Sequence, residues 1–408
     1  MSKDVVRRVF KFRLYPGSER EQRMFKFVET CRRLWNDALY HRKHRWEEDH
    51  VSTSRWLQQD ILVEAKRSDP DLAELYSQSA QDILRRLDLA YKAFFNGIAK
   101  KPKFHKFRNE GSFVYPQAYN GSVVLGEKTV RLSKVGEVPI VVHREIPKDG
   151  RLDICCIRKE ACGEWYAILT YETSQPLVNS KEVFDSPLGI DLGLKSIITT
   201  TEGQKVEPPH FYRKSQGRLR RLQRQLARRQ KGSKNREKAR QLVAIQHAKV
   251  RRQREHFNNV LSCRIVKDHD LVVMEDLRIR NMVRNHRLAK SISDAGWGQL
   301  KVMVDYKEKK IGGRMLPIDP AGTTSECFFC GTKNDVDLSM REFDCSGCGR
   351  HLERDFHSSW RILKEGLSQI GQGMPEYTRV EMASLPTQPN WAANVVEEAG
   401  TILGGVKP

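Results

Sequence analysis

Hydrophobic and polar residues alternate at the start of the chain and again after residue 113. Residues 9–14 place phenylalanine and leucine on one side and lysine and arginine on the other, which predicts a strand. Alternation returns over residues 113–171, where Gly and Pro separate the runs, as expected for a small β-barrel or sandwich. The two stretches together predict one β domain formed by residues 1–17 and 111–180.

The intervening residues 18–110 change to helical spacing, with apolar positions recurring along one face from Phe25 onward. We therefore expect a block of three or four helices inserted into the β domain. Trp35, Trp56 and Trp297 lie on helical apolar faces and are expected in the core, in preference to stacking on bases.

The following region, residues 185–320 with 353–368, has the pattern of a mixed α/β domain. Two apolar runs at 187–191 and 271–275 predict buried strands. Between them, residues 213–254 hold 17 Lys or Arg and one acid, with leucines at helical spacing. This pattern predicts a basic helical hairpin whose apolar side packs and whose charged side faces solvent or phosphate.

Three acids stand out because of their neighbours. Asp191 closes the first apolar run, Glu275 closes the second, and Asp355 opens the last predicted helix. Taken singly, they suit a turn residue, an arginine partner and a helix cap. An uncompensated charge in a core is costly, however, and carboxylate oxygens are preferred ligands of Mg²⁺ and Mn²⁺. Together the three acids have the layout of RNase H-like nucleases, in which two ions support in-line attack on a phosphodiester.

Other acids near these runs are given lesser roles. Asp276, beside Glu275, is at most a group that supports a metal ligand from outside. Asp268 and Asp270 are expected to be exposed to solvent.

Four of the nine cysteines have the spacing of a metal site. Cys327 and Cys330 form one Cys-x-x-Cys pair, and Cys345 and Cys348 form a second pair 14 residues later. Two such turns supply four thiolates to Zn²⁺, which predicts a structural zinc ribbon over residues 321–352 with no open coordination position. A redox dithiol is the alternative.

The formal net charge of +21 is spread along the chain and indicates a polyanionic partner. Nucleic acid is the expected partner, and an anionic membrane surface is the alternative. An isolated basic run is often only a solvated face, but the charge of the whole chain favours phosphate contacts. The candidate contacts are six arginines in the first helix of the hairpin: Arg218, Arg220, Arg221, Arg224, Arg228 and Arg229.

Nothing in the sequence has the length and apolarity of a spanning helix or a signal-peptide core, so we expect a cytoplasmic protein and no membrane partner. Residues 369–408 lose periodicity and gain Gly and Pro, which predicts a flexible tail that packs weakly or is disordered.

The ordered set of motifs resembles the TnpB family of transposon-encoded RNA-guided nucleases, which are related to type V CRISPR effectors. The resemblance spans residues 8–366 and lies in the order of its parts. Those parts are the basic run 220–238, VVMEDL at 272–277 with Asn281-Met282, KSISDAGWG at 290–298, and the four cysteines followed by Arg354-Asp355. Segments KPKF at 101–104 and YPQ at 115–117 also look like family segments.

This resemblance implies a wedge-type β domain with a helical recognition insertion, then a split RuvC domain carrying Asp191, Glu275 and Asp355. The ribbon would be its target-nucleic-acid-binding insertion. A guide RNA, a double-stranded DNA target, Mg²⁺ or Mn²⁺ and structural Zn²⁺ are the implied partners and cofactors. The implied setting is the nucleoid of a prokaryotic cell.

One departure from the family pattern concerns the third acid. Family members commonly have Asn two residues after it, whereas this chain has His357. His357 is expected to replace the Asn in hydrogen bonding or to alter metal occupancy at low pH. A nuclease-dead guided regulator and a DNA-binding protein or transposase acting without RNA are the alternative functions.

Overall fold

The computed structural model describes residues 6–173, 181–321, 325–337 and 340–374. The chain forms two compact units that divide between Pro176 and Leu177. Within the described ranges, no helix combines the length and apolar character needed to cross a bilayer.

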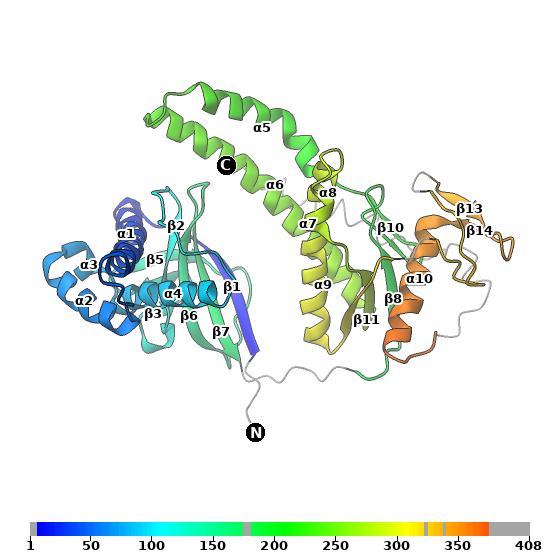
Figure 1. The fold of residues 1–408 in the computed structure, drawn as a ribbon, viewed down its shortest axis with the longest axis horizontal. Helices are drawn as coiled ribbons and strands as arrows, with labels where there is room; N and C mark the ends of the chain where they lie inside the picture. The colour runs from blue at the N-terminus through cyan, green and yellow to red at the C-terminus, as the bar shows by residue number, and fades with distance from the viewer. Residues whose placement is uncertain (1–5, 174–180, 322–324, 338–339, 375–408) are drawn as a thin grey trace. The chain divides into compact units, whose positions relative to one another are not determined.

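The first unit is built on a seven-stranded antiparallel sheet that curves into a nearly closed barrel (Figure 1). The strand order is β2-β6-β7-β1-β5-β4-β3. The first and last long strands pair along their whole length, from Val6 opposite Thr173 to Leu14 opposite Trp165. The strands are β1 (Val6–Leu14), β2 (Gly111–Tyr115), β3 (Val123–Leu125), β4 (Thr129–Leu132), β5 (Gly136–Val141), β6 (Arg151–Lys159) and β7 (Trp165–Thr173).

Four helices follow β1 in the chain and precede β2 (Figure 1). They share one hydrophobic core with the sheet, in which Phe12 of β1, Phe27 of α1 and Phe113 of β2 are fully buried. Burial of these rings fixes the helices on the sheet. The helices are α1 (Ser18–Asp49), α2 (Arg55–Ser68), α3 (Pro70–Glu74) and α4 (Ser77–Phe95), and a 3₁₀ turn, η1, spans Ala118–Asn120.

The three tryptophans have different environments. Trp297 is buried in the core of the second unit, and Trp35 packs at the edge of the first core, where its ring stacks on His105. The prediction is wrong for Trp56, which is 65% exposed. The buried face of α2 carries Gln58 and leucine, and Trp56, two positions before Gln58, projects from the other side of the helix.

The second unit contains a five-stranded mixed sheet in the order β10-β9-β8-β11-β12 (Figure 1). β8, β11 and β12 run parallel, while β9 and β10 pair antiparallel beside them. The strands are β8 (Pro187–Asp191), β9 (Ile198–Thr200), β10 (Lys205–Val206), β11 (Leu271–Glu275) and β12 (Arg314–Ile318). The mixed α/β prediction is confirmed for this unit.

Helices cover both faces of this sheet, and the central strand β11 shows the division. Val272 and Met274 enter one core with α6, α8 and α9, whereas Leu271 and Val273 enter another with α10. This alternation is that of a strand buried on both faces. The helices are α5 (Phe211–Arg228), α6 (Lys234–Lys267), α7 (Ile279–Met282), α8 (Ala289–Ala295), α9 (Trp297–Ile311) and α10 (Arg354–Gln369).

A small hairpin of β13 (Glu342–Asp344) and β14 (His351–Glu353) leads directly into α10. At the start of the predicted tail, Ile370 and Met374 pack partly buried against the α10 core. Gln372 also exchanges two hydrogen bonds with the backbone of Phe184, at 2.6 and 3.1 Å. The rest of the predicted tail, residues 375–408, lies outside the described residues.

Candidate functional site

Two of the three predicted acids lie at the carboxyl ends of neighbouring parallel strands. Ile190 of β8 pairs with Met274 of β11, so Asp191 and Glu275 are the next residues on adjacent strands. Adjacent strands lie about 4.8 Å apart. Ile190 and Met274 face the α6/α9 core, and therefore Asp191 and Glu275 face the α10 side of the sheet.

The third acid, Asp355, is in the first turn of α10, which packs on that same side. Two glycines allow the helix to lie close to the sheet. A Cβ on Gly189 would be 2.2 Å from the carbonyl oxygen of Ser359, and a Cβ on Gly366 would be 2.5 Å from Cγ1 of Val273. Only glycine fits either position without movement of the helix.

The three carboxylates influence one another electrostatically. Burial raises the pKa of Asp191 well above its ordinary range, and the nearby charges of Glu275 and Asp355 raise it further. Arg354 opposes this shift in part. Gathered negative charge in a partly buried place is the environment that a divalent cation stabilises, and an all-carboxylate donor set suits Mg²⁺ or Mn²⁺.

Two arginines reach Asp355. Arg354 donates to its Oδ1 through Nε at 3.0 Å and Nη2 at 2.7 Å, and Nη1 of Arg341 is 3.5 Å from its Oδ2. These charge-assisted contacts limit the rotation of the carboxylate. Asp355 is thus oriented from the helix and from the hairpin before it.

The other acids differ from one another. Asp276 is exposed and pairs with Lys301 of α9. The prediction that Asp270 is exposed is wrong: this buried carboxylate accepts hydrogen bonds from Lys181 at 2.7 Å and from the backbone N–H groups of Asp185 and Ser186. Asp270 precedes β11, so it lies at the opposite end of the strand from Glu275.

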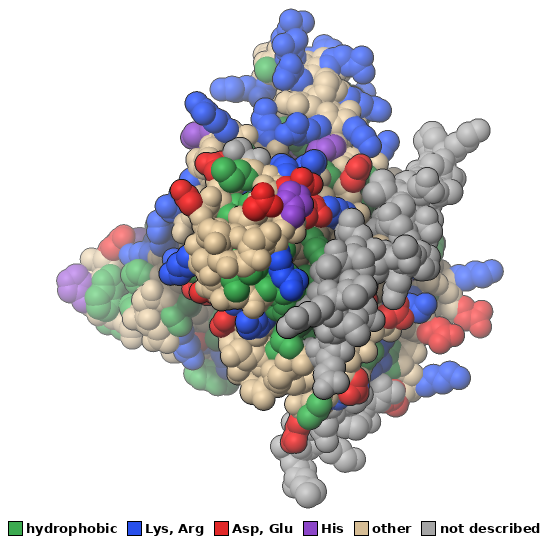
Figure 2. Space-filling model, turned by 90° about the vertical axis from the view of Figure 1, so that its right-hand side faces the viewer, with side chains coloured by type: hydrophobic (Ala, Val, Ile, Leu, Met, Phe, Trp, Pro, Cys, Tyr) green, Lys and Arg blue, Asp and Glu red, His purple; other side chains and the backbone are tan. Residues whose placement is uncertain are grey.

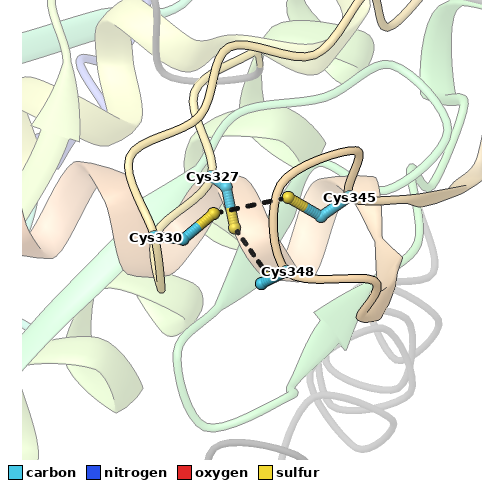
Figure 3. A group of neighbouring side chains, drawn as sticks. All are labelled: Cys327, Cys330, Cys345 and Cys348. Carbon is cyan, nitrogen blue, oxygen red and sulfur yellow. Dashed lines mark hydrogen bonds between the residues drawn. The ribbon is translucent and has the colours of Figure 1, made fainter.

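Four cysteine side chains point toward one another from two loops (Figure 3). Their sulfurs all lie within 4.8 Å of one another, with Cys327 and Cys348 at 3.9 Å and Cys330 and Cys345 at 3.5 Å (Figure 3). This set can hold a metal ion, and four thiolates match tetrahedral Zn²⁺. We call residues 325–337 and 340–353 the four-cysteine ribbon.

The two loops repeat one backbone pattern. Gly331 and Gly349 have left-handed φ values of 75° and 66°, and each donates its N–H to the carbonyl of the first cysteine of its pair, at 2.9 and 2.8 Å. Glycine adopts this conformation without the strain that a Cβ brings. The repeat explains why one glycine follows each Cys-x-x-Cys pair.

Thiol ionisation differs within the group. Burial raises the pKa of the Cys327 thiol to about 12. Burial would also raise the pKa of Cys345, but N–H groups of Cys348 and Gly347 donate to its sulfur and the pKa falls to about 6. A coordinated metal deprotonates thiols outright, so both would bind as thiolates.

Besides the cysteines, one further group in the described ranges has three ligand atoms within 4.8 Å, namely Glu160, Cys162 and Glu164. Lys11 contacts Glu160 at 2.6 Å and Arg13 contacts Glu164 at 2.5 Å, so ion pairs account for these acids. Asp191, Glu275 and Asp355 are not gathered that tightly.

His357 does not face the acids. It is buried, and its Nε2 accepts a hydrogen bond of 2.8 Å from the backbone N–H of Phe328, between the first two ribbon cysteines. Burial, with the charge of Arg361, lowers the pKa of His357 to about 4, so the imidazole is neutral near pH 7 and can accept. The expected hydrogen bond therefore exists, but its partner is the ribbon. No sequence signal linked positions 328 and 357.

The basic hairpin consists of α5 and α6, which pack antiparallel (Figure 1). Leu219 is the buried residue of α5. Figure 2 shows Lys and Arg side chains gathered on a projecting part of the surface. All six candidate arginines are exposed, and none forms an ion pair with another described residue: Arg218, Arg220, Arg221, Arg224, Arg228 and Arg229.

Known sequences match the same parts of the chain. Residues 169–286 match a family described as "Probable transposase", and residues 297–362 match "Cas12f1-like, TNB domain". A Streptomyces pristinaespiralis protein named "Putative RNA-guided DNA endonuclease" is 31% identical over 398 residues, covering 95% of this chain and 97% of its own. The chain belongs to the TnpB family. The resemblance inferred from the motifs is thereby confirmed.

A second TnpB relative, from Escherichia coli K12, is named "Putative RNA-guided DNA endonuclease InsQ". It is 30% identical over 388 residues, covering 89% of this chain and 93% of its own. One chain of "Cryo-EM structure of the Cas12f1-sgRNA-target DNA complex" has a TM-score of 0.55 and 12% identity, covering 88% of this chain and 98% of that one. That likeness concerns the fold alone.

Residues 1–50 match a family described as "Helix-turn-helix domain". In this TnpB-family chain the described part of that segment is instead a strand, β1, and a single helix of 32 residues, α1. The description therefore does not match the fold of these residues.

Proposed function

We propose that this TnpB-family chain is an RNA-guided DNA endonuclease with a RuvC-type centre formed by Asp191, Glu275 and Asp355. One observation carries the proposal: two acids end adjacent parallel strands on the face where α10 supplies the third. The strand order, with antiparallel β9 and β10 beside β8, supports an RNase H-like fold. The names of the relatives support the substrate and the guide.

The three carboxylates would hold Mg²⁺ or Mn²⁺. When bound, two such ions activate water and stabilise the leaving 3′ oxygen in in-line hydrolysis of a phosphodiester. Asp191, Glu275 and Asp355 would together supply the carboxylate oxygens that hold the ions. The hydrogen bond from Arg354 would keep Asp355 oriented for this role.

The remaining parts have roles in handling nucleic acid. The exposed arginines of α5 would neutralise phosphates of the guide RNA or the guide–target duplex, whose sequence is read by base pairing. The ribbon, with structural Zn²⁺, would bind target DNA. The barrel and α1–α4 would act as the wedge and recognition parts, and a short flanking DNA motif would be read by the protein before both strands are cut in turn.

A guided DNA-binding regulator without cleavage is the second candidate. The presence of all three acids in one charged environment argues against it. A DNA-binding protein that acts without RNA would explain the positive charge but not the resemblance to the named relatives.

The test is to purify the protein from its native locus, sequence the bound RNA and assay cleavage of matching DNA with Mg²⁺. Asp191→Ala should abolish cleavage. Asp276→Ala is the matched control, because this exposed acid adjoins Glu275 but pairs with Lys301, and it should retain cleavage. Protein without bound RNA would refute guidance, and an active Asp191→Ala would refute the proposed centre.

A further inference from the structure

The helix that carries Asp355, α10, makes contacts through two of its faces. The face toward the sheet holds Asp355, Ser359 and Gly366, with Ser359 and Gly366 at the close contacts with β8 and β11. A second face holds His357, Trp360, Arg361 and Lys364, which share a helical stripe because they are three or four residues apart. The second face meets the four-cysteine ribbon.

Phe328, between Cys327 and Cys330, makes most of these contacts. Its N–H donates to Nε2 of His357 at 2.8 Å, and its carbonyl accepts from Lys364 at 3.4 Å. Its ring packs on Trp360, with centroids 5.7 Å apart. Beside it, Glu326 pairs with Arg361.

The other half of the ribbon reaches the same end of the helix. The ring of Phe343, from β13, lies edge-on to His357 with centroids 5.5 Å apart. The backbone N–H of Arg354 donates to the carbonyl of Arg341 at 2.8 Å, and the Arg341 side chain reaches Asp355. Both halves of the ribbon therefore contact the first turns of α10.

We propose that His357 is a positioning residue that couples metal binding in the ribbon to the placement of Asp355. The Phe328 N–H lies inside the first Cys-x-x-Cys loop, whose next N–H groups, of Phe329 and Cys330, donate to the Cys327 sulfur. The imidazole therefore fixes the loop that holds the metal and the helix turn that holds the acid. The consequence for cleavage rests on the proposed nuclease function; the coupling between the ribbon and α10 does not.

The length of the side chain at position 357 distinguishes this role from one in which any polar side chain would suffice. A Gln side chain places an acceptor about where imidazole Nε2 lies, whereas Asn ends near the position of Nδ1. His357→Gln should therefore keep the contact with Phe328, and His357→Asn and His357→Ala should lose it. His351→Ala is the matched control, because this ribbon histidine is exposed and pairs with Asp344 instead of α10.

The experiment uses the full chain with its bound RNA and three readouts. These are the rate of zinc release to a chelator, hydrogen exchange over residues 354–364, and the affinity for Mn²⁺ at the acid site, defined as the binding lost in Asp191→Ala. We expect His357→Ala and His357→Asn to release zinc about 10-fold faster and to bind Mn²⁺ about 10-fold more weakly, with faster exchange in α10. His357→Gln and His351→Ala should resemble wild type.

Should His357→Ala fold poorly, removing zinc from wild type tests the same coupling. Exchange should then rise in residues 354–364 but not in α9. The proposal is overturned if zinc removal leaves exchange in α10 unchanged, or if His357→Ala releases zinc faster while its Mn²⁺ affinity stays at the wild-type value. If wild type binds Mn²⁺ but fails to cleave guided DNA, the nuclease function fails while these measurements still decide the coupling.

Discussion

Replacing Gly189 with alanine should separate Asp355 from the two strand-end acids. The added Cβ would lie 2.2 Å from the carbonyl oxygen of Ser359 and 2.8 Å from Cβ of Leu363, and real Cβ contacts below 3.0 Å are essentially absent. Because the obstacle at Ser359 is backbone, the helix itself must move away by nearly 1 Å. The strand cannot shift to relieve this clash, since β8 is hydrogen-bonded to a neighbouring strand on each edge.

The size of the effect follows from this movement. Overpacking of a core costs about 1–3 kcal/mol, which corresponds to a melting temperature lower by about 2–12 °C for a unit of this size. A misplacement of about 1 Å at a catalytic group can slow the reaction about 100-fold. We therefore expect a modest loss of stability with a disproportionate loss of cleavage.

The assay combines thermal unfolding with single-turnover cleavage by the RNA-bound protein, well below the melting temperature. Gly217→Ala is the control, since nothing lies within 4 Å of its Cβ position in α5 and the change should add about 0.5–1 kcal/mol of stability. Equal stability and cleavage in the two variants would refute the close-packing account of how α10 is placed.

Three further changes test other parts of the molecule. Asp191→Asn should raise the melting temperature in the presence of chelator. The pKa of Asp191 is raised in the folded protein, so the wild type loses stability as pH rises above the ordinary pKa of an aspartate. The stability gained by the variant should therefore shrink toward pH 4, and Mg²⁺ should stabilise only the wild type. Changing Arg220, Arg221 and Arg224 together to Gln should lower the slope of log binding constant against log salt by about 2–3 for RNA, and an unchanged slope would exclude phosphate contacts there. Glu308 is fully buried, both of its carboxylate oxygens lack a hydrogen bond among the described residues, and burial raises its pKa to about 8. The wild type should therefore lose stability as pH rises from 4.5 to 8. Glu308→Gln should flatten this pH dependence of the free energy of unfolding, measured by denaturant unfolding at several pH values.

Local patterns predicted the elements well, because burial on one or both faces leaves a direct trace in the order of residues. The apolar runs ending in Asp191 and Glu275 are strands, and the spacing of four cysteines led to sulfurs within 4.8 Å of one another. Contacts between distant positions left no such trace. Asp270 appeared exposed because its partner Lys181 lies 89 residues earlier. The role of His357 depends on the backbone of Phe328, and a backbone N–H carries no sequence signature.

The position of Asp355 on the last described helix also has a consequence for synthesis. The strand that carries Asp191 leaves the ribosome 164 residues before the helix turn that completes the proposed centre. At roughly 5–20 residues per second, the interval is about 8–33 s. In the later part of that time, after α6 ends at Lys267, the nascent chain displays its basic hairpin but lacks the third carboxylate. Under the proposed function, the chain would meet its RNA while still being translated and would become able to cut only after α10 is made.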